Sequence, residues 1–459
     1  MRKTLLLVFI LSSFYSLQAQ LAGFKTYSLK QAVEYGVQNN ISAKNAKLSE
    51  TEAKARNHEL LSIGLPQINA NFDYQYYIIR PTSPAIGAAF SGIPGFSQVL
   101  KPGTPIYFVL PNNINTGVNL NQLVYDTRYF IGIQTFKHLI TLSQQTTALT
   151  EQDVRYNIIK SYCEVQAAKE IMQLLDSNLV IIQKLLHDTR ETFKAGLIEE
   201  TDVDRLELGE STLKSQINNT KNLYDLGMSA LKYNMGLQLT DRIALTDNVA
   251  ELRKQIADFT PASFDPSQRI EAQLLETSIM LKTYDKKQRQ AGYYPSIYTF
   301  ANFGGGSQVN YVHQFFTKQD LGNGQTASNW FDQAYVGFTI KIPIYDGGQK
   351  EASVKQAKIE LQKAKNDLEN FKNQSSLQVD AAKTTFATNL IEEQNAKETM
   401  RINNKIYTKT QTKYKEGVSS SFELIQTQQD QTSNLIRYYT AVKNVLTSRA
   451  DLDKALGKQ

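Results

Sequence analysis

The 459-residue sequence has a single cysteine, Cys163, and only four histidines. One cysteine excludes a disulfide framework, and four dispersed histidines lack the spacing of metal ligands. The sequence also lacks a nucleophile motif, a P-loop and a dinucleotide fingerprint, so we expect no enzyme and no cofactor. A formal net charge of +6, scattered along the chain, does not indicate a nucleic-acid partner.

Long hydrophobic runs are also missing, except at the start. Arg2 and Lys3 precede an apolar stretch that ends at Tyr15, which is typical of a secretory signal peptide over residues 1–19. That stretch is too short to span a bilayer, and no later run approaches the roughly 18 residues that a membrane helix needs. We therefore expect an exported chain that reaches a membrane, if at all, through strands.

Alternating apolar and polar residues indicate four strands. In the clearest segment, residues 67–78, isoleucine, phenylalanine and tyrosine occupy one face, while asparagine, glutamine and aspartate predominate on the other. About ten residues is the length of a transmembrane barrel strand. Loops rich in proline, glycine and asparagine separate the strands, and we place the glycines at 304–306 in such a loop. The pattern predicts β-hairpins at about 67–125 and 295–345.

Aromatic residues gather near the expected strand ends, where outer-membrane barrels carry interfacial girdles. A soluble sandwich would also bury an apolar sheet face, but it needs a second sheet, and the sequence supplies only four strands. The membrane interpretation is therefore favoured. The expected girdle residues are Tyr76, Tyr77, Phe300, Trp330, Phe331 and Tyr335.

A long helix follows each hairpin, and the whole pattern recurs about 220 residues later. Proline-free helical sequence covers residues 126–194 and 349–415, roughly 100 Å each at 1.5 Å per residue. In the second copy, a seam from Ala357 to Tyr414 follows alternating spacings of three and four residues, as in coiled coils. Equal spacing in both copies indicates an internal duplication.

Glycines end the long helices, and shorter return helices follow at 201–235 and 421–456. The segment FKAGLIEETDV at 193 recurs there as YKEGVSSSFEL at 414. A helix also precedes each hairpin, at 28–61 and 267–290. We therefore divide the chain into a signal peptide (1–19), a first repeat (20–236), a linker or equatorial segment (237–266) and a second repeat (267–459).

Four strands cannot close into a barrel. An open sheet edge in lipid leaves unpaired backbone groups that cost several kcal/mol each, and the smallest closed barrels have about eight strands. The chain must therefore oligomerise. Two copies would supply eight strands, three copies twelve and four copies sixteen, and only the larger closures leave an open bore.

Several segments together resemble the TolC-type outer membrane efflux protein family: SLKQAVEYGVQNN at 28, LPQI at 65, PIYDGGQ at 343 and the paired glycine segments. The resemblance implies a mixed α and β membrane protein, a homotrimer whose twelve-stranded β-barrel continues as a long α-helical coiled-coil barrel. It implies a passive exit duct in outer membrane lipid that extends into the periplasm. Its partners would be a periplasmic adaptor (membrane fusion) protein and an inner-membrane transporter, in a tripartite efflux or type I secretion system.

The resemblance also assigns site residues. Gly196, Leu197, Gly417 and Val418 match the family's periplasmic tips, where the adaptor docks, although the glycines would equally serve as plain helix caps. Glu423 and Gln426 lie three apart on one helical face and match an acidic ring at the narrow entrance, here with half the usual charge. The alternative for this pair is an ordinary solvated face.

Thr201, Asp202 and Tyr414 match a latch that holds the family's entrance shut. The arginine of that latch corresponds here to Ser419, so a charge-assisted bond is missing, but a contact between Tyr414 and Asp202 is still expected. Tyr414 would otherwise belong to the coiled-coil seam.

A trimeric coiled-coil surface adhesin or structural spacer without channel activity is the main alternative. It would also combine a signal peptide, heptads and few strands. Such a protein would carry its strands at one chain end, whereas here they are inserted twice between helices. A periplasmic four-helix sensor domain is less suitable, because it requires transmembrane helices.

Overall fold

The computed structural model describes residues 25–83, 106–107, 109–254, 256, 264–322 and 324–458. The expected signal peptide, residues 1–19, lies outside the described residues, as do parts of the first hairpin loop and of the linker segment. The chain forms two compact units. The helical unit comprises Met1–Glu52, Ile140–Ile279 and Ala364–Gln459, and the sheet unit comprises Ala53–Leu139 and Met280–Lys363.

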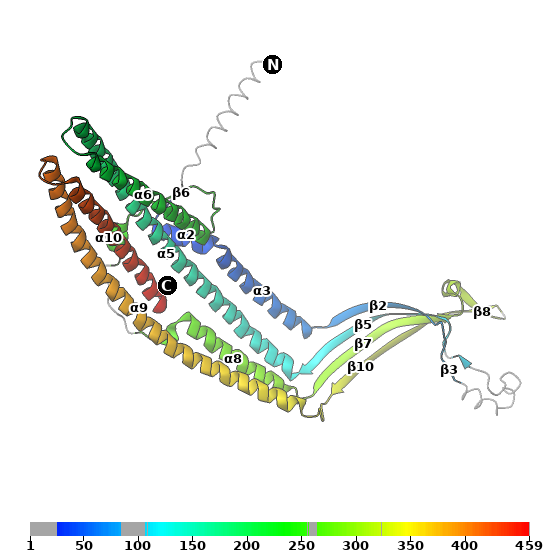
Figure 1. The fold of residues 1–459 in the computed structure, drawn as a ribbon. Helices are drawn as coiled ribbons and strands as arrows, with labels where there is room; N and C mark the ends of the chain where they lie inside the picture. Colours follow the sequence, from blue (N-terminus) through cyan, green and yellow to red (C-terminus); the bar gives the residue numbers. More distant parts are fainter. Residues whose placement is uncertain are drawn as a thin grey trace, which may run out of the picture. The chain divides into compact units, whose positions relative to one another are not determined.

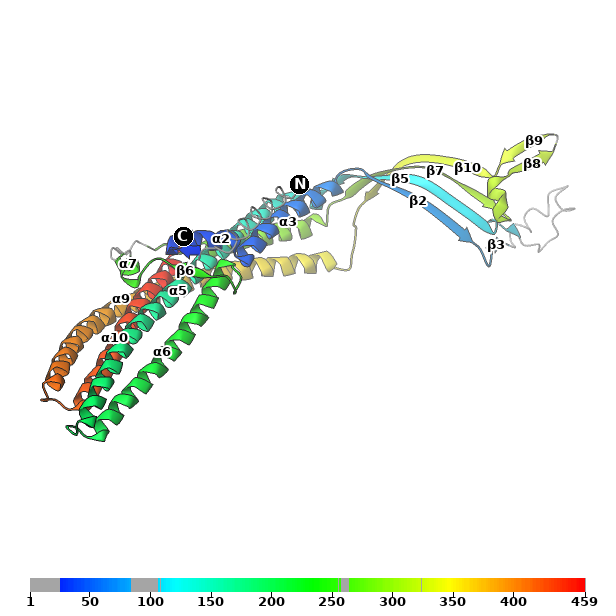
Figure 2. The same cartoon turned by 90° about the horizontal axis from the view of Figure 1, so that it is seen from above.

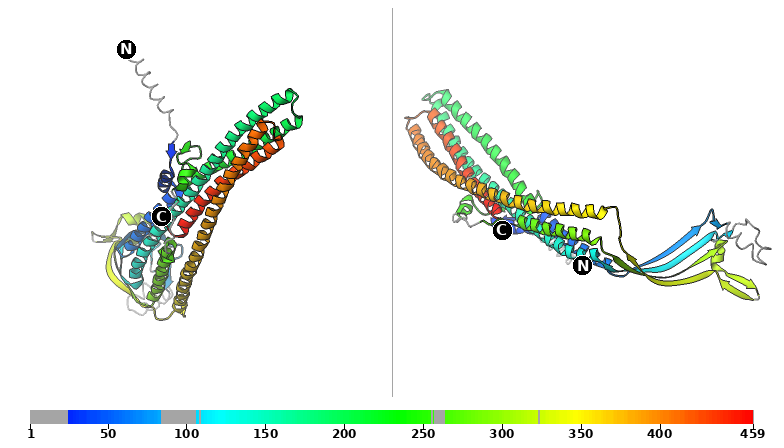
Figure 3. Two further views of the ribbon diagram at one scale, coloured as in Figure 1. Left: turned by 90° about the vertical axis from the view of Figure 1, so that its left-hand side faces the viewer. Right: turned by 90° about the horizontal axis from the view of Figure 1, so that it is seen from below.

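Two long helices dominate the chain: α5 (Thr127–Lys194) with 68 residues and α9 (Gln349–Lys415) with 67 (Figure 1). Each turns back into a return helix, α6 (Glu200–Met235) or α10 (Ser421–Ala455), as the paired green and orange-red hairpins of Figure 3 show. Three shorter helices precede the strand hairpins. The first hairpin follows α2 (Leu29–Asn39) and α3 (Ile41–Ile63), and the second follows α8 (Ile270–Ala291).

The helix expected over residues 28–61 is interrupted at Asn40, where the backbone is extended (φ −57°, ψ 135°). The Asn40 side chain stabilises the break in both directions. Its Oδ1 accepts from the backbone N–H of Ser42 at 2.8 Å, and its Nδ2 donates to the carbonyl of Asn234 at 2.8 Å. The side chain thus caps α3 and ties the break to α6.

The middle of the chain adds a small sheet that sequence patterns do not reveal. Strand β6 (Ile243–Leu245) pairs in parallel with β1 (Lys25–Tyr27), and helix α7 (Val249–Lys254) follows. The Tyr162 hydroxyl on α5 donates to the carbonyl of Tyr27 at 3.0 Å. The surrounding core of the helical unit includes the fully buried side chains of Ile158, Leu231 and Met235.

Four antiparallel strands form the main sheet in the order β10–β7–β5–β2, side by side in Figures 1 and 2. They are β2 (Gln67–Tyr76), β5 (Asn112–Asp126), β7 (Ser296–Val309) and β10 (Trp330–Lys341). The two hairpins pair as expected, and β5 with β7 joins them into one sheet. The prediction of long helices with four strands per chain is confirmed.

One face of this sheet is apolar and exposed. Paired residues of neighbouring strands point to the same side, and successive residues of one strand to opposite sides. The pairing therefore places Phe72, Val118, Phe303, Val336 and Phe338 on one face. All five side chains are at least 45% exposed, so the chain leaves this part of the face uncovered.

The opposite face is polar and carries a chain of side-chain amides. Asn119 donates to Asn71 at 2.7 Å, and Asn302 donates to Asn119 at 2.5 Å. Three of the residues expected in an interfacial girdle lie on this polar face by their register: Phe300, Phe331 and Tyr335. That part of the girdle prediction is wrong, because neighbouring positions of a strand alternate between faces.

The glycines at 304–306 lie within β7 rather than in a loop. A Cβ added at Gly305 would come within 2.6 Å of the Phe331 carbonyl oxygen, and one at Gly304 would meet the carbonyl oxygen of Thr116. Glycine therefore allows the strands to approach closely here. Short strands complete the sheet unit: β3 (Thr82–Ser83), β4 (Ile106–Tyr107), β8 (Lys318–Gly322) and β9 (Gln325–Ser328), with the 3-10 helix η2 (Val312–Phe316).

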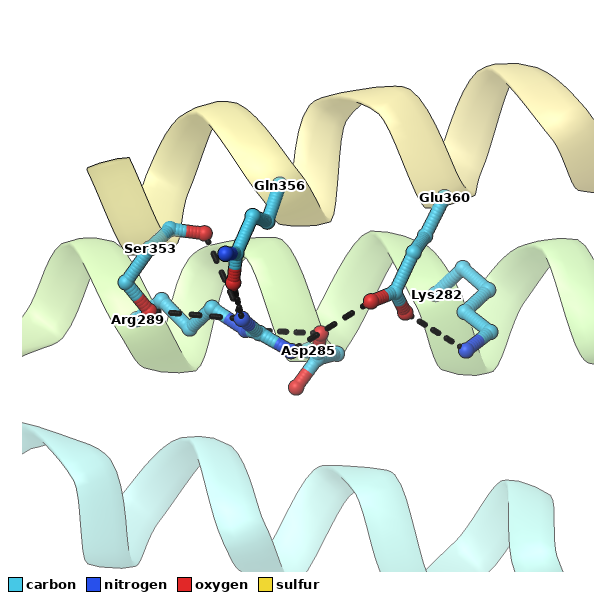
Figure 4. Close-up of polar contacts among 6 residues, drawn as sticks. All are labelled: Lys282, Asp285, Arg289, Ser353, Gln356 and Glu360. Carbon is cyan, nitrogen blue, oxygen red and sulfur yellow. Dashed lines mark hydrogen bonds and ion pairs between the residues drawn. The ribbon is translucent and has the colours of Figure 1, made fainter. Parts of the chain in front are cut away.

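A polar network joins α8 to the start of α9 in the sheet unit (Figure 4). Arg289 pairs with Asp285 at 3.0 Å and with Glu360 at 3.7 Å, and donates to Ser353 Oγ at 3.3 Å. Lys282 pairs with the second oxygen of Glu360 at 2.8 Å. Glu360 on α9 thus forms ion pairs with two basic side chains of α8, Lys282 and Arg289.

Candidate functional site

The ends of the two long helices have the same backbone geometry. At the first, Gly196 has φ 73°, its N–H donates to the carbonyl of Phe193 at 2.8 Å, and the Leu197 N–H donates to that of Thr192 at 3.2 Å. This pair of bonds is the Schellman motif, in which a left-handed glycine ends a helix.

The second turn repeats this arrangement at Gly417, with φ 74°. The Gly417 N–H donates to the carbonyl of Tyr414 at 3.0 Å, and the Val418 N–H donates to that of Lys413 at 2.9 Å. A Cβ added at either glycine would meet nothing within 4 Å. The positive φ, rather than crowding, therefore explains glycine at both positions.

Each turn presents one exposed apolar side chain directly after its glycine. Leu197 is 76% exposed and Val418 is 73% exposed. The four residues that the sequence singles out as tips therefore form two matching turns in the helical unit, each with a glycine-capped helix end and an uncovered aliphatic side chain.

The residues expected to form the latch lie beside these turns but use other partners than predicted. The Tyr414 hydroxyl shares a hydrogen bond of 3.1 Å with Thr189 on α5. The carboxylate of Asp202 accepts a hydrogen bond from the hydroxyl of Ser421 on α10. Thr201 donates to Glu199 at 3.2 Å. Within the single chain, Tyr414 and Asp202 therefore each bond a different helix instead of each other.

Glu423 and Gln426 are exposed on the first turns of α10. Ser419 donates its hydroxyl to the Glu423 carboxylate at 2.6 Å, and Ser420 caps the helix by accepting from the Glu423 N–H at 3.2 Å. Gln426 donates to Asp430 at 3.2 Å. Glu423, Gln426 and Asp430 thus follow one another along one side of α10.

Sequence reasoning missed Asp430, Thr189 and Ser421. Asp430 was recognisable in principle, because it lies four residues after Gln426 and therefore shares its face. Thr189 and Ser421 lie on helices that the chain brings together only in three dimensions, so nothing in the local sequence marks them.

The helices that carry the two turns pack against each other through buried apolar side chains. Leu206 of α6 and Leu424 of α10 are fully buried in one apolar cluster with Leu175 of α5. Arg190 and Glu207 form an ion pair of 2.6 Å between α5 and α6, although both side chains are about half exposed. Such exposed pairs contribute little, roughly 0–1 kcal/mol, so burial fixes the geometry of the tips.

In the part of the chain that the structure describes, no three histidine, cysteine, aspartate or glutamate side chains gather in a way that would hold a metal ion. None of the described helices combines the length and the apolar character needed to cross a membrane.

Known proteins resemble this chain in sequence. A family model described as "Outer membrane efflux protein" matches residues 273–458. The proteases secretion protein PrtF of Dickeya chrysanthemi is 25% identical over 232 residues, which are 49% of this chain and 46% of PrtF. The outer membrane protein TolC of Vibrio cholerae is 21% identical over 262 residues, 56% of each protein. The chain thus spans about half the length of the curated relatives it matches.

Solved structures share its fold. The Campylobacter jejuni CmeC outer membrane channel superimposes with a TM-score of 0.72 at 16% identity, covering 94% of this chain and 85% of CmeC. The Vibrio cholerae outer membrane protein VceC gives a TM-score of 0.67 at 13% identity, with coverages of 94% and 96%. These likenesses define the class as a TolC-like fold, with long helices and a four-stranded sheet in each chain. In sequence, the chain resembles the outer membrane efflux protein family over residues 273–458.

Proposed function

We propose that this protein is a passive exit channel of the outer membrane, extending into the periplasm and serving a tripartite efflux or type I secretion system. In this role it is no enzyme, and the energy for transport comes from an inner-membrane transporter that is reached through a periplasmic adaptor. The observation that carries the proposal is the four-stranded sheet, which has one exposed apolar face and, among the strands that the structure describes, two unpaired edges.

The sheet edges support a closed oligomer. Among the described strands, β2 and β10 each pair on one side only. In lipid, every backbone N–H and C=O needs a partner, so β2 of one protomer must pair with β10 of the next. Three copies would close a twelve-stranded barrel, the number that the family resemblance favours, with the apolar face toward lipid and the amide-rich face toward the bore.

Crosslinking between the edge strands tests this closure. A chain carrying Phe72→Cys on β2 and Val336→Cys on β10, treated with a short bismaleimide in cell envelopes, should give covalent dimers and trimers and no larger species. As a control, Val118→Cys with Phe303→Cys joins residues that are paired within one chain and should give no intermolecular product. A ladder ending at two or four copies would refute the trimer, and monomers alone would refute the barrel.

The tips support adaptor docking. Leu197→Asp combined with Val418→Asp keeps both glycines and should lower the amount of adaptor recovered by crosslinking in cells by roughly tenfold, equivalent to about 1.4 kcal/mol. Leu239→Asp is the matched control, since Leu239 is 61% exposed beside the turn at Gly236. Equal recovery from the tip variant and the control would exclude docking at these residues.

The acidic side of α10 supports an entrance constriction. In a trimer, Glu423 would supply three carboxylates, and Asp430 would supply three more about one helical turn beyond Gln426. Carboxylate rings favour cations in a pore. Glu423→Gln with Asp430→Asn should therefore reduce the cation preference seen in single-channel recordings, whereas Glu369→Gln, on an exposed position of α9, should not. An unchanged preference in the double variant would rule out the ring.

The recurrence of the glycine turns along the chain supports an internal duplication. The Schellman turn at Gly236 recurs at Gly457, as that at Gly196 recurs at Gly417, which favours an internal duplication with repeats at 20–236 and 267–459.

The adhesin or spacer alternative does not explain why one face of the sheet is apolar and exposed. Channel current in planar bilayers separates the two classes, because a spacer gives none.

A further inference from the structure

A folded segment covers part of the sheet at the end remote from the helices. We call it the collar; it comprises residues 311–322 and 324–330, including η2 and the β8–β9 hairpin (Figure 2). The collar is tied together by side chains. Trp330 Nε1 donates to the carbonyl of Phe315 at 2.9 Å, and Asn329 donates to the carbonyls of Gln314 and Thr317 at 2.7 and 2.9 Å.

Phe315 fixes the collar to the apolar face of the sheet. Its side chain is 4% exposed and packs with Ile114 and Val309. The rings of Tyr74 and Trp330 lie with their centroids 6.4 Å from that of Phe315. The strand pairing places Ile114 on the face that also bears Val118 and Phe303, and Val309 and Trp330 share it. The collar is therefore mounted on the apolar face of the sheet, not on the amide-rich face.

The collar exposes large apolar and aromatic side chains alongside polar ones such as Lys318, Gln319 and Asp320. Phe316 is 85% exposed, Tyr311 66%, Leu321 58% and Val312 53%. Four large exposed side chains within eleven residues are costly in water, at about 25 cal/mol per Å² of apolar surface. On the sheet face that carries the collar, Phe303 is also 71% exposed. Large apolar side chains exposed together in one short segment are typical of an interaction site.

We propose that the collar is a lipid-binding surface, which inserts Tyr311, Phe316 and Leu321 at the boundary between acyl chains and headgroups in the outer leaflet. This inference rests on the proposed function, because it requires the sheet to lie in the membrane. Aromatic residues are favoured at that boundary because they combine an apolar ring with a polar edge. Phe315 would hold the collar against the barrel wall while its neighbours contact lipid.

The only tryptophan of the chain, Trp330, provides a native probe. Full-length protein is reconstituted into phosphatidylcholine vesicles brominated either near the headgroups or deep in the acyl chains. Three further probes are introduced with Trp330→Phe: Phe316→Trp in the collar, Phe338→Trp on the apolar face and Tyr335→Trp on the polar face. We expect shallow bromines to quench Trp330 and the Phe316→Trp probe roughly twofold, deep bromines to quench the Phe338→Trp probe, and neither to quench the Tyr335→Trp probe.

The outcomes separate this inference from the proposed function. Quenching of the Phe338→Trp probe without quenching of Trp330 or of the Phe316→Trp probe would overturn the lipid-binding collar and leave the channel intact; the collar would then face water or a protein. No quenching of the Phe338→Trp probe would overturn the membrane-embedded sheet, and the collar inference with it. Wild-type Trp330 keeps the test valid even where Trp330→Phe weakens the collar.

Discussion

Cys163 illustrates how position decides the chemistry of a single residue. The side chain lies on α5, is 2% exposed and belongs to the main core of the helical unit. Burial disfavours the charged thiolate and raises the pKa of the thiol to about 12, from 9.0. This environment keeps the thiol inert rather than reactive.

We therefore expect Cys163 to resist alkylation in the folded protein. A pKa higher by about three units leaves roughly a thousandfold less thiolate near neutral pH, and burial also hinders access of the reagent. Iodoacetamide at pH 8, followed by mass spectrometry, should leave the native protein unmodified and label the urea-unfolded chain completely. Fast labelling of the native protein would show that this region opens readily.

The hydrogen bond between Tyr414 and Thr189 should couple the two hairpins near the tips. Tyr414→Phe and Thr189→Val each remove one partner of the 3.1 Å hydrogen bond. We therefore expect each variant to lower the free energy of unfolding by about 0.5–1.5 kcal/mol. The double variant should cost less than the sum of the two, because both remove the same interaction. Thermal unfolding measures this, and channel recordings of the same variants show whether opening is affected. Strict additivity would indicate that the bond contributes nothing.

At the scale of elements, Glu360 joins α8 to α9. The hydrogen bond and positive charge of Lys282 lower the pKa of the Glu360 carboxyl below its ordinary value of 4.5. A carboxyl with a lowered pKa in the folded state stabilises that state fully above 4.5, and the contribution is lost as the pH falls through the folded pKa. The pairing of α8 with α9 should therefore weaken in acid.

Melting curves between pH 7 and pH 3 test this coupling. Glu360→Gln should reduce the acid-induced fall in melting temperature, because its side chain cannot be protonated, while Glu369→Gln on the same helix should leave the fall unchanged. If Glu360→Gln and wild type lose the same number of degrees, the pair does not contribute to the acid sensitivity.

Sequence patterns predicted the elements better than their details. The long helices and four strands follow from hydrophobic period and from glycine, which are local signals. The break at Asn40 was missed because its stabilising contact, to the carbonyl of Asn234, comes from a distant helix. The girdle was partly misplaced because the aromatic residues of a strand do not all face the same side. Phe300 and Phe303 lie three apart in one strand and so face opposite sides of the sheet, and the register shows that Phe300 lies on the polar side.

At the scale of the whole molecule, the two faces of the sheet can be compared directly by changing two neighbouring residues that point to opposite sides. Phe338 lies on the apolar face and is 72% exposed, whereas Thr339 lies on the face with the amide chain. An arginine on the lipid side of a barrel costs about 2–4 kcal/mol near the bilayer centre, and a trimer would bear that cost three times. An arginine facing the bore remains hydrated and costs little.

We therefore expect Phe338→Arg to abolish the heat-modifiable oligomer in outer-membrane fractions and Thr339→Arg to retain it, with an altered ion preference in bilayer recordings. Both variants introduce an arginine, one residue apart in the same strand, so the added charge alone cannot explain opposite outcomes. If both variants assemble equally, the apolar face does not meet lipid, and a partner protein must cover it instead. If both fail, the strand tolerates no charge on either side, and the polar face cannot line a water-filled bore.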